Sequence, residues 1–169
     1  MEYRNIDITI VSAEGLKKVT LLSKMQPYAV VYVVDPHIGL RTQVDKQGGT
    51  NPAWNQRLSL PVSDALFHKP GSFLNVVIWS KGSLMGDKLV GKASIPLSQL
   101  LQESNREETM KTCPLRRSSF EVTGAVRLSI HVCDKLTTQA VPFCRRGPPS
   151  PCPQRRDQMN FFCGFVPIC

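Results

Sequence analysis

The chain has 169 residues, of which 41% are hydrophobic and 20% charged, and its formal net charge is +8. This length is enough for one domain with a real core, and the composition is that of a globular protein. No apolar run approaches the roughly 18 residues that cross a bilayer, and the N-terminus lacks the basic and apolar segments of a secretory signal. We therefore expect a cytoplasmic protein or one that binds peripherally to membranes.

Six cysteines raise the question of disulfides or metal ligands. Without a secretory signal, reduced thiols are the expected state. No two cysteines have the C-x-x-C spacing, and no histidine lies near those of the C-terminal region. The sequence therefore predicts no metal site and no cofactor.

Basic charge is spread over the whole chain. Residues 137–169 contain four arginines and one aspartate, a net charge of +3, which leaves +5 on residues 1–136. Basic surfaces attract phosphate groups, on anionic lipid or on nucleic acid. The alternative interpretation is a solvated surface that only keeps the protein soluble.

Short stretches with strand patterns follow one another along the chain. In residues 5–11, Ile6, Ile8 and Ile10 alternate with polar residues, as in a half-buried strand. Residues 97–104 have the one helical pattern, with leucines at 97, 100 and 101. The predicted strands are 5–11, 28–34, 40–46, 54–62, 72–79, 88–97, 109–115 and 125–132.

Eight short strands with turn signals between them indicate an antiparallel sheet protein, because an α/β fold would need a helix between most strands. From residue 137 onward the chain contains six of the thirteen prolines and four of the six cysteines. Proline at this density favours neither sheet nor helix. We predict a domain at residues 1–136 and a disordered Pro/Arg/Cys-rich tail at residues 137–169.

Three segments carry a resemblance to a known family. "QPYAVVYVV", "RTQVDKQGGTNPAWN" and "GDKLVGKASIPLSQLL" have the order and spacing found in C2 domains, and the resemblance covers residues 4 to about 133. "LKKVTLLSKMQPYAVV" and "VDKQGGTNPAWN" are similar to the small plant single-C2-domain proteins of the cold-regulated and copine-associated group. This resemblance implies an all-β, eight-stranded, Greek-key β-sandwich, and a role in stress or defence signalling at membranes.

The resemblance also implies five positions at which calcium-dependent members carry aspartates. Calcium takes six to eight oxygen ligands, so such sites need several acids. Two positions lie in the first loop and three in the loop after the strand "NVVIW". None of the five is an aspartate here, and Asp87 stands beside the last of them. The matched positions are Thr20, Gln26, Ser80, Gly82 and Lys88.

Lysines occupy the same loops instead of acids. We predict that Lys17, Lys18, Lys24, Lys81 and Lys88 form a positive end that binds anionic lipid without calcium. Apolar residues at the predicted loop tips would add contact with the membrane. These tip residues are Leu21, Leu22, Leu84 and Met85. The alternatives are that the lysines are ordinary solvated charges and that Leu84 and Met85 fold back onto the domain.

A second basic site, on the concave face, is known in some C2 domains. Arg41, Lys46 and Arg57 are the only candidates for it here, and Val30 and Tyr32 stand where such domains place lysines. Trp54 and Trp79 are expected to pack in or beside the core.

Cysteines in the tail stand beside basic or apolar residues. Cys144, Cys163 and Cys169 are therefore candidates for S-acylation, a second membrane signal, although incidental cysteines in an unstructured tail are the alternative.

The sequence predicts a binding protein that is not an enzyme. Its three histidines lie on separate segments, and no nucleophile elbow, phosphate-binding loop or zinc-protease motif is present. No nucleic-acid-binding motif accompanies the basic charge. We predict a monomeric adaptor that binds anionic lipid, a copine-like protein, or both. The alternative is a protein-interaction module without lipid affinity.

Overall fold

The computed structural model describes residues 2–83, 85–103, 108–118 and 121–137. The chain divides into two units, Met1–Gln139 and Ala140–Cys169, and all described residues lie in the first.

Strands dominate the described part of the chain. They are β1 (Glu2–Glu14), β2 (Pro27–Tyr32), β3 (Leu40–Arg41), β4 (Ala53–Ser63), β5 (Phe73–Ser80), β6 (Lys88–Pro96), β7 (Thr109–Arg116), β8 (Val122–Val132) and β9 (Leu136–Thr137). The helical elements are the 3-10 turn η1 (Pro36–Ile38), α1 (Asp64–His68) and α2 (Leu97–Glu103).

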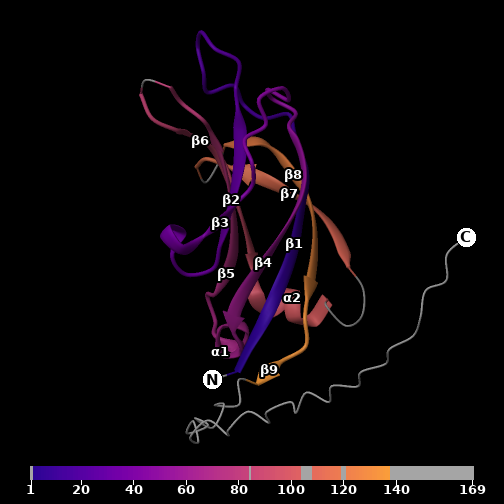
Figure 1. Cartoon of the computed structure of the whole chain (residues 1–169). Helices are drawn as coiled ribbons and strands as arrows, with labels where there is room; N and C mark the ends of the chain where they lie inside the picture. The colour runs from indigo at the N-terminus through magenta and orange to yellow at the C-terminus, as the bar shows by residue number, and fades with distance from the viewer. Residues whose placement is uncertain (1, 84, 104–107, 119–120, 138–169) are drawn as a thin grey trace, which may run out of the picture. The chain divides into compact units, whose positions relative to one another are not determined.

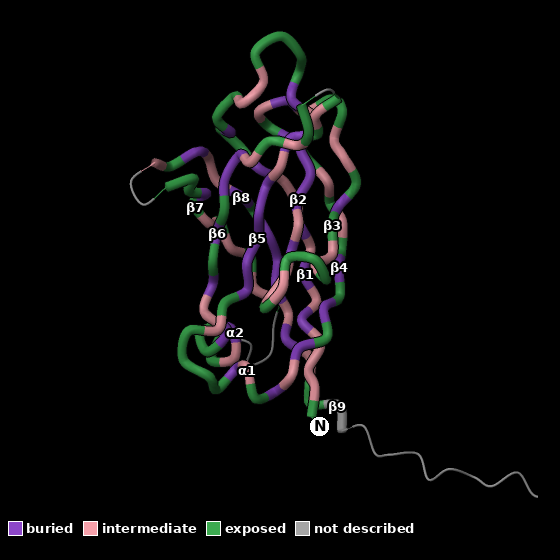
Figure 2. Tube along the Cα trace, turned by 90° about the vertical axis from the view of Figure 1, so that its left-hand side faces the viewer, coloured by how far each residue is buried: buried purple, intermediate pink, exposed green. Residues whose placement is uncertain are grey.

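Eight strands follow one antiparallel path, β3-β2-β5-β6-β7-β8-β1-β4, and β9 adds to the start of β1. β6 and β7 share a single ladder pair, Lys92 with Arg116, so the path divides there into two four-stranded sheets. Figure 2 shows the first sheet with β6, β5, β2 and β3 side by side. The inner faces of both sheets contribute to one buried cluster. The predicted all-β, eight-stranded antiparallel sandwich is confirmed.

β1 shows how the sequence produces this arrangement. Ile6, Ile8 and Ile10 are completely buried, as their alternation predicts. Ile8 lies between Leu58 of β4 and Ile130 of β8. Because successive side chains point to opposite faces, each of the three isoleucines enters the core, and the polar residues between them remain on the outer face.

The third strand and the number of helices differ from the prediction. The strand expected at residues 40–46 ends at Arg41, since Thr42 turns its side-chain oxygen inward to accept a hydrogen bond from the Ala29 N–H at 2.9 Å. A second helix, α1, follows β4. Five residues are too few to show a helical period in the sequence.

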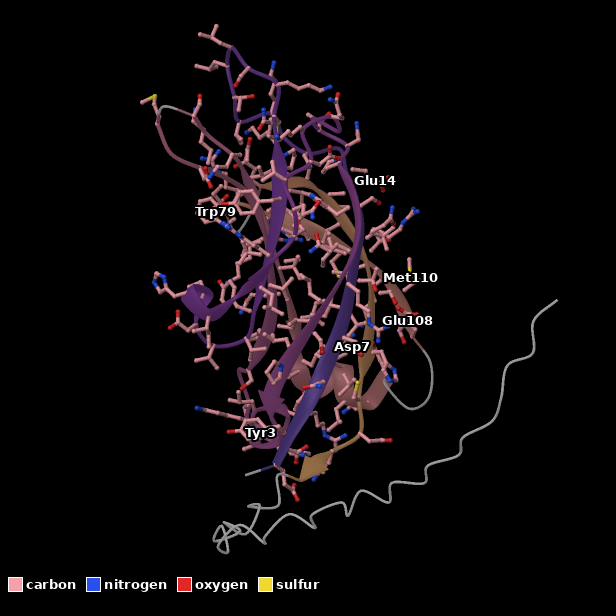
Figure 3. The ribbon with its side chains drawn as sticks, in the orientation of Figure 1. Tyr3, Asp7, Glu14, Trp79, Glu108 and Met110 are labelled. Atoms are coloured by element: carbon pink, nitrogen blue, oxygen red, sulfur yellow. The ribbon has the colours of Figure 1, made fainter. Side chains whose placement is uncertain are left out.

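The two ends of the sandwich differ in character. The loops before β2, before β4 and before β6 gather at one end, at the top of Figure 1, and both α-helices lie at the other. We call these the loop end and the helix end. Tyr3, labelled in Figure 3, lies at the helix end, where β9 pairs with β1.

A charge cluster fastens the helix end. Asp64, at the start of α1, is buried and accepts a hydrogen bond from Arg4 Nε at 2.6 Å. Lys135 Nζ lies 2.9 Å from the same carboxylate and 3.1 Å from Glu2. The hydrogen bonds from Arg4 and Lys135 lower the pKa of Asp64 to about 2. The cluster therefore links α1 and β1 to Lys135, the residue just before β9.

Asp64→Asn is expected to lower the free energy of unfolding by about 2 kcal/mol at pH 7, because Arg4 and Lys135 lose a charged partner. The folded-state pKa lies below the unfolded one, so the contribution is fully present above about pH 4 and is lost as the pH falls toward 2. Urea unfolding of both proteins between pH 7 and pH 2 measures this. A stability difference that did not shrink on acidification would contradict the assigned role.

Candidate functional site: the loop end

Three loops form the loop end, and backbone hydrogen bonds join them. We name them loop one (residues 15–26), loop two (residues 42–52) and loop three (residues 81–87). The Lys81 N–H donates to the Gln26 carbonyl at 2.9 Å, which joins loop three to loop one. The Leu16 N–H donates to the Thr50 carbonyl at 3.0 Å, which joins loop one to loop two. The three loops thus form one connected surface.

The positions matched to calcium ligands are engaged inside the loops or are cationic. Ser80 is buried, and its hydroxyl oxygen accepts a hydrogen bond from the Gln26 N–H at 3.4 Å. The Thr20 hydroxyl donates to the Ser23 carbonyl at 2.6 Å. Lys88 begins β6 and is exposed. None of these side chains presents a carboxylate to a metal ion.

Gly82, the fourth matched position, has no room for a side chain. A Cβ atom there would stand 1.9 Å from the Gly86 carbonyl oxygen and 2.7 Å from its carbon. Contacts this short with backbone atoms require the loop itself to move. The path of loop three therefore requires a residue without a side chain at position 82.

Asp87 is the one acid of loop three, and its oxygens are already bound. The carboxylate accepts hydrogen bonds from the Tyr28 hydroxyl at 2.6 Å and the Gly82 N–H at 3.0 Å, and Lys81 Nζ lies at 3.5 Å. The Gly82 and Tyr28 hydrogen bonds lower the pKa of Asp87. Burial and the adjacent Asp87 raise the pKa of Tyr28 to about 12, so Tyr28 remains the donor at neutral pH. This carboxylate fastens loop three to β2.

No group of three or more potential metal-binding side chains gathers within the described residues, and the acid of loop two, like Asp87, is bound within its own loop. Asp45 in loop two accepts hydrogen bonds from the backbone of Gln47, Gly48 and Ala53 at 2.8 to 2.9 Å. The acids of the loop end thus stabilise loops.

The five predicted lysines fall into two groups. Lys17 forms an ion pair with Glu121, and Lys81 forms one with Asp87. Lys18, Lys24 and Lys88 have no ion pair within the described residues. The partner of Lys17 lies 104 residues away in the sequence, at the β7–β8 hairpin. Sequence reasoning missed this neutralising contact, because no local pattern signals it.

Apolar side chains stand free at the tips of loops one and three. Leu21, Leu22 and Met85 are 89%, 103% and 87% exposed. An open pocket of about 250 Å³ lies between the two loops, lined by these three residues together with Lys81 and Lys88. Met85 therefore does not fold back onto the sandwich, whereas Leu84 lies outside the described residues.

The three candidates for a second basic site lie on different elements. Arg57 on β4 forms an ion pair with Asp7 of β1 at 2.6 Å. Lys46 lies in loop two, and Arg41 on β3 lines a pocket of about 380 Å³ beside Tyr28.

Of the two tryptophans, Trp54 has a packing role. Trp54 donates from Nε1 to the Pro27 carbonyl at 3.2 Å and packs against the core. Trp79 lies on β5 and is half-buried (Figure 3).

Predictions for the tail concern residues that the structure does not describe. Cys144, Cys163 and Cys169 lie outside the described residues, and their S-acylation stays a prediction. Neither α1 nor α2, the described α-helices, has the length and apolar character needed to cross a membrane.

Comparison with known proteins identifies the family. The C2 domain model matches residues 4–112. The chain is 35% identical over 159 residues to "Protein SRC2 homolog" of Arabidopsis thaliana, covering 93% of this chain and 48% of that protein. It is 30% identical over 101 residues to "BON1-associated protein 2" of the same plant, covering 58% and 45%. The chain thus spans about half the length of these curated relatives.

Solved structures show the same fold. A C2 domain of plant Extended Synaptotagmin 1 superposes with a TM-score of 0.62 at 18% identity, covering 76% of this chain and 93% of that one. A C2 domain-containing protein from a putative elicitor-responsive gene gives 0.57 at 24% identity, covering 75% and 86%. With its β-sandwich, its three-loop end and its match over residues 4–112, the chain belongs to the C2 domain family.

Proposed function

We propose that the loop end binds anionic phospholipid membranes without calcium, and that the protein acts as a membrane-peripheral adaptor. The observation that carries this proposal is a set of lysines around a surface with exposed apolar tips, in loops that have no acid at the matched positions. Lys18, Lys24 and Lys88 surround that surface without ion-pair partners among the described residues. Each lysine near an anionic surface contributes about 1 kcal/mol, so together they supply reversible attraction.

Apolar contact adds to this attraction. Leu21 and Leu22 stand next to Lys18 and Lys24 in loop one, so the leucines can enter the headgroup region while the ammonium groups remain among the phosphates. Peripheral binding of this kind needs no membrane-spanning segment. We also propose that the protein is cytoplasmic and acts as a monomer.

The adaptor role rests on the relatives. One of them is named for its association with BON1, and a solved neighbour comes from a putative elicitor-responsive gene. We propose a protein partner, of the copine-like kind, in stress or defence signalling. The second candidate is a protein-interaction module without lipid affinity, for which the same loop end would contact protein. Neither function requires catalysis or nucleic-acid binding.

Salt dependence tests the lipid proposal. The full-length protein is mixed with phosphatidylserine-containing or pure phosphatidylcholine vesicles in EGTA, and flotation is measured over a series of sodium chloride concentrations. We expect binding to the phosphatidylserine vesicles only, weakening as salt screens the lysines. Absence of binding to either vesicle at low salt would favour the protein-interaction module.

Leu21→Ser with Leu22→Ser is expected to weaken vesicle binding about tenfold without lowering the melting temperature. Burial of a leucine side chain contributes about 1.5–3 kcal/mol, of which partial insertion realises a part. Both side chains are free of the core, so stability should be unchanged. Val34→Ser with Ile38→Ser removes two exposed apolar residues outside the three loops and serves as the control. Equal effects of the two double variants would argue against insertion of loop one.

A further inference from the structure

A cleft opens where the two sheets separate. β6 and β7 pair only at Lys92 and Arg116. Beyond that pair the strands diverge toward α2 and border an open cleft of about 710 Å³. It is lined by residues 92–96, 111–114 and 116–118, together with Gln99. None of the loop-end residues lines it, so this cleft is separate from the proposed lipid site.

The walls of the cleft are strand edges. Ala93, Ser94 and Ile95 are consecutive and all line it, as do Thr112 and Cys113 on the other side. Since successive side chains point to opposite faces of a sheet, a run of lining residues means that the edge of the strand faces the cleft. The other edge of β6 pairs with β5, and that of β7 pairs with β8. Two strand edges are thus presented to one space.

The two edges are not equivalent. β7 carries Pro114, which has no N–H to donate and is typical of an edge that does not accept another strand. β6 has no proline between Lys88 and Ile95. The edge at Ala93–Ile95 is therefore the one that can form a ladder with an added strand.

Floor and rim of the cleft differ chemically. Ala93 and Ile95 are each 5% exposed, and with the half-buried Cys113 they make the floor apolar. Lys92 and Arg117 are exposed at the rim, and Lys92 Nζ lies 5.8 Å from the centre of the Tyr32 ring. Lys111 also lines the cleft but is paired with Glu103. The lining residues include no acid. An added strand that matches this cleft alternates apolar residues toward the floor with acidic residues toward the rim.

We infer that the cleft binds an extended acidic segment of a partner protein, which adds to β6 as a strand. Main-chain hydrogen bonds provide affinity in this recognition mode, and the alternating side chains provide specificity. The chain's own tail does not fit, because residues 137–169 carry a net charge of +3 and the rim is also cationic. The inference does not depend on lipid binding at the loop end.

The test uses a series of fluorescent nine-residue peptides that alternate valine with glutamine or glutamate, from no glutamate to four. Fluorescence anisotropy with the full-length protein is expected to show affinity rising with each glutamate. Lys92→Glu with Arg117→Glu should weaken the four-glutamate peptide at least tenfold. Lys69→Glu with Arg127→Glu reverses two exposed charges outside the cleft and should change affinity less than twofold.

Hydrogen exchange locates the contact. Within residues 93–95, the amides that point into the cleft are expected to gain protection when the four-glutamate peptide binds, whereas the amides that point toward β5 are expected to keep the protection they already have. Absence of binding by every peptide, equal weakening by both double variants, or no added protection on β6 would overturn the inference. It would also be overturned if Lys92→Glu with Arg117→Glu abolished binding to phosphoinositide vesicles while peptide binding persisted, since the cleft would then be a lipid site.

Discussion

Lys18→Glu, Lys24→Glu and Lys88→Glu together are expected to abolish binding to phosphatidylserine vesicles, with a loss of at least about a hundredfold. Three lysines at about 1 kcal/mol each account for a loss of this size on neutralisation alone, and reversal adds repulsion. These three have no ion pair among the described residues, and the charge of Lys24 contributes to lowering the pKa of Asp45. Vesicle flotation in EGTA measures the effect.

A matched control variant distinguishes the effect of the three loop-end lysines from the effect of net charge. Lys69, Lys92 and Arg127 are exposed cations outside the three loops, and their reversal changes the net charge by the same amount. We expect this control to weaken binding by less than tenfold, since screening limits distant charges. Equal losses in the two triple variants would mean that net charge alone attracts the protein to membranes.

Gly82→Asp is expected to disrupt loop three rather than to create a calcium ligand. The new Cβ would meet the Gly86 carbonyl oxygen at 1.9 Å, so the loop backbone must move. That movement displaces the Gly82 N–H from Asp87 and loosens the contact of Asp87 with Tyr28. We expect the free energy of unfolding to fall by about 1–3 kcal/mol, as for other overpacked sites. Thermal unfolding and calcium titration calorimetry measure both effects.

Two further variants show whether the added Cβ or the added charge causes the loss of stability. Gly82→Ala adds the same Cβ without charge and should destabilise the protein to a similar degree. Ser83→Asp adds an acid at an exposed position in the same loop and should leave stability unchanged. Calcium binding by Gly82→Asp with unchanged stability would show that the loop accommodates an acid there.

Much of the sandwich was predictable because its signals are local. Alternation in β1 identified the buried isoleucines, and the apolar runs identified β2 and β5. The shortened β3 was not predictable in the same way. Its end depends on Thr42 bonding to Ala29 on the neighbouring strand, and a pattern in one segment carries no information on its partner.

The loop end was predictable in composition but not in pairing. The sequence shows which lysines lie in the loops, yet the ion pair of Lys17 with Glu121 depends on the β7–β8 hairpin reaching loop one. The lack of space at Gly82 likewise arises from the path of the chain through Gly86. The cleft between β6 and β7 follows from where two sheets part, which no motif records.

Calcium dependence of vesicle binding is the most direct test of lysines acting in place of metal ligands. The full-length protein is sedimented with phosphatidylserine-containing vesicles in calcium and in EGTA, with phosphatidylcholine vesicles as the reference. We predict the same bound fraction in both buffers for the phosphatidylserine vesicles and none for the reference. Binding that appeared only with calcium would contradict the proposal and would mean that the loop end holds a metal ion.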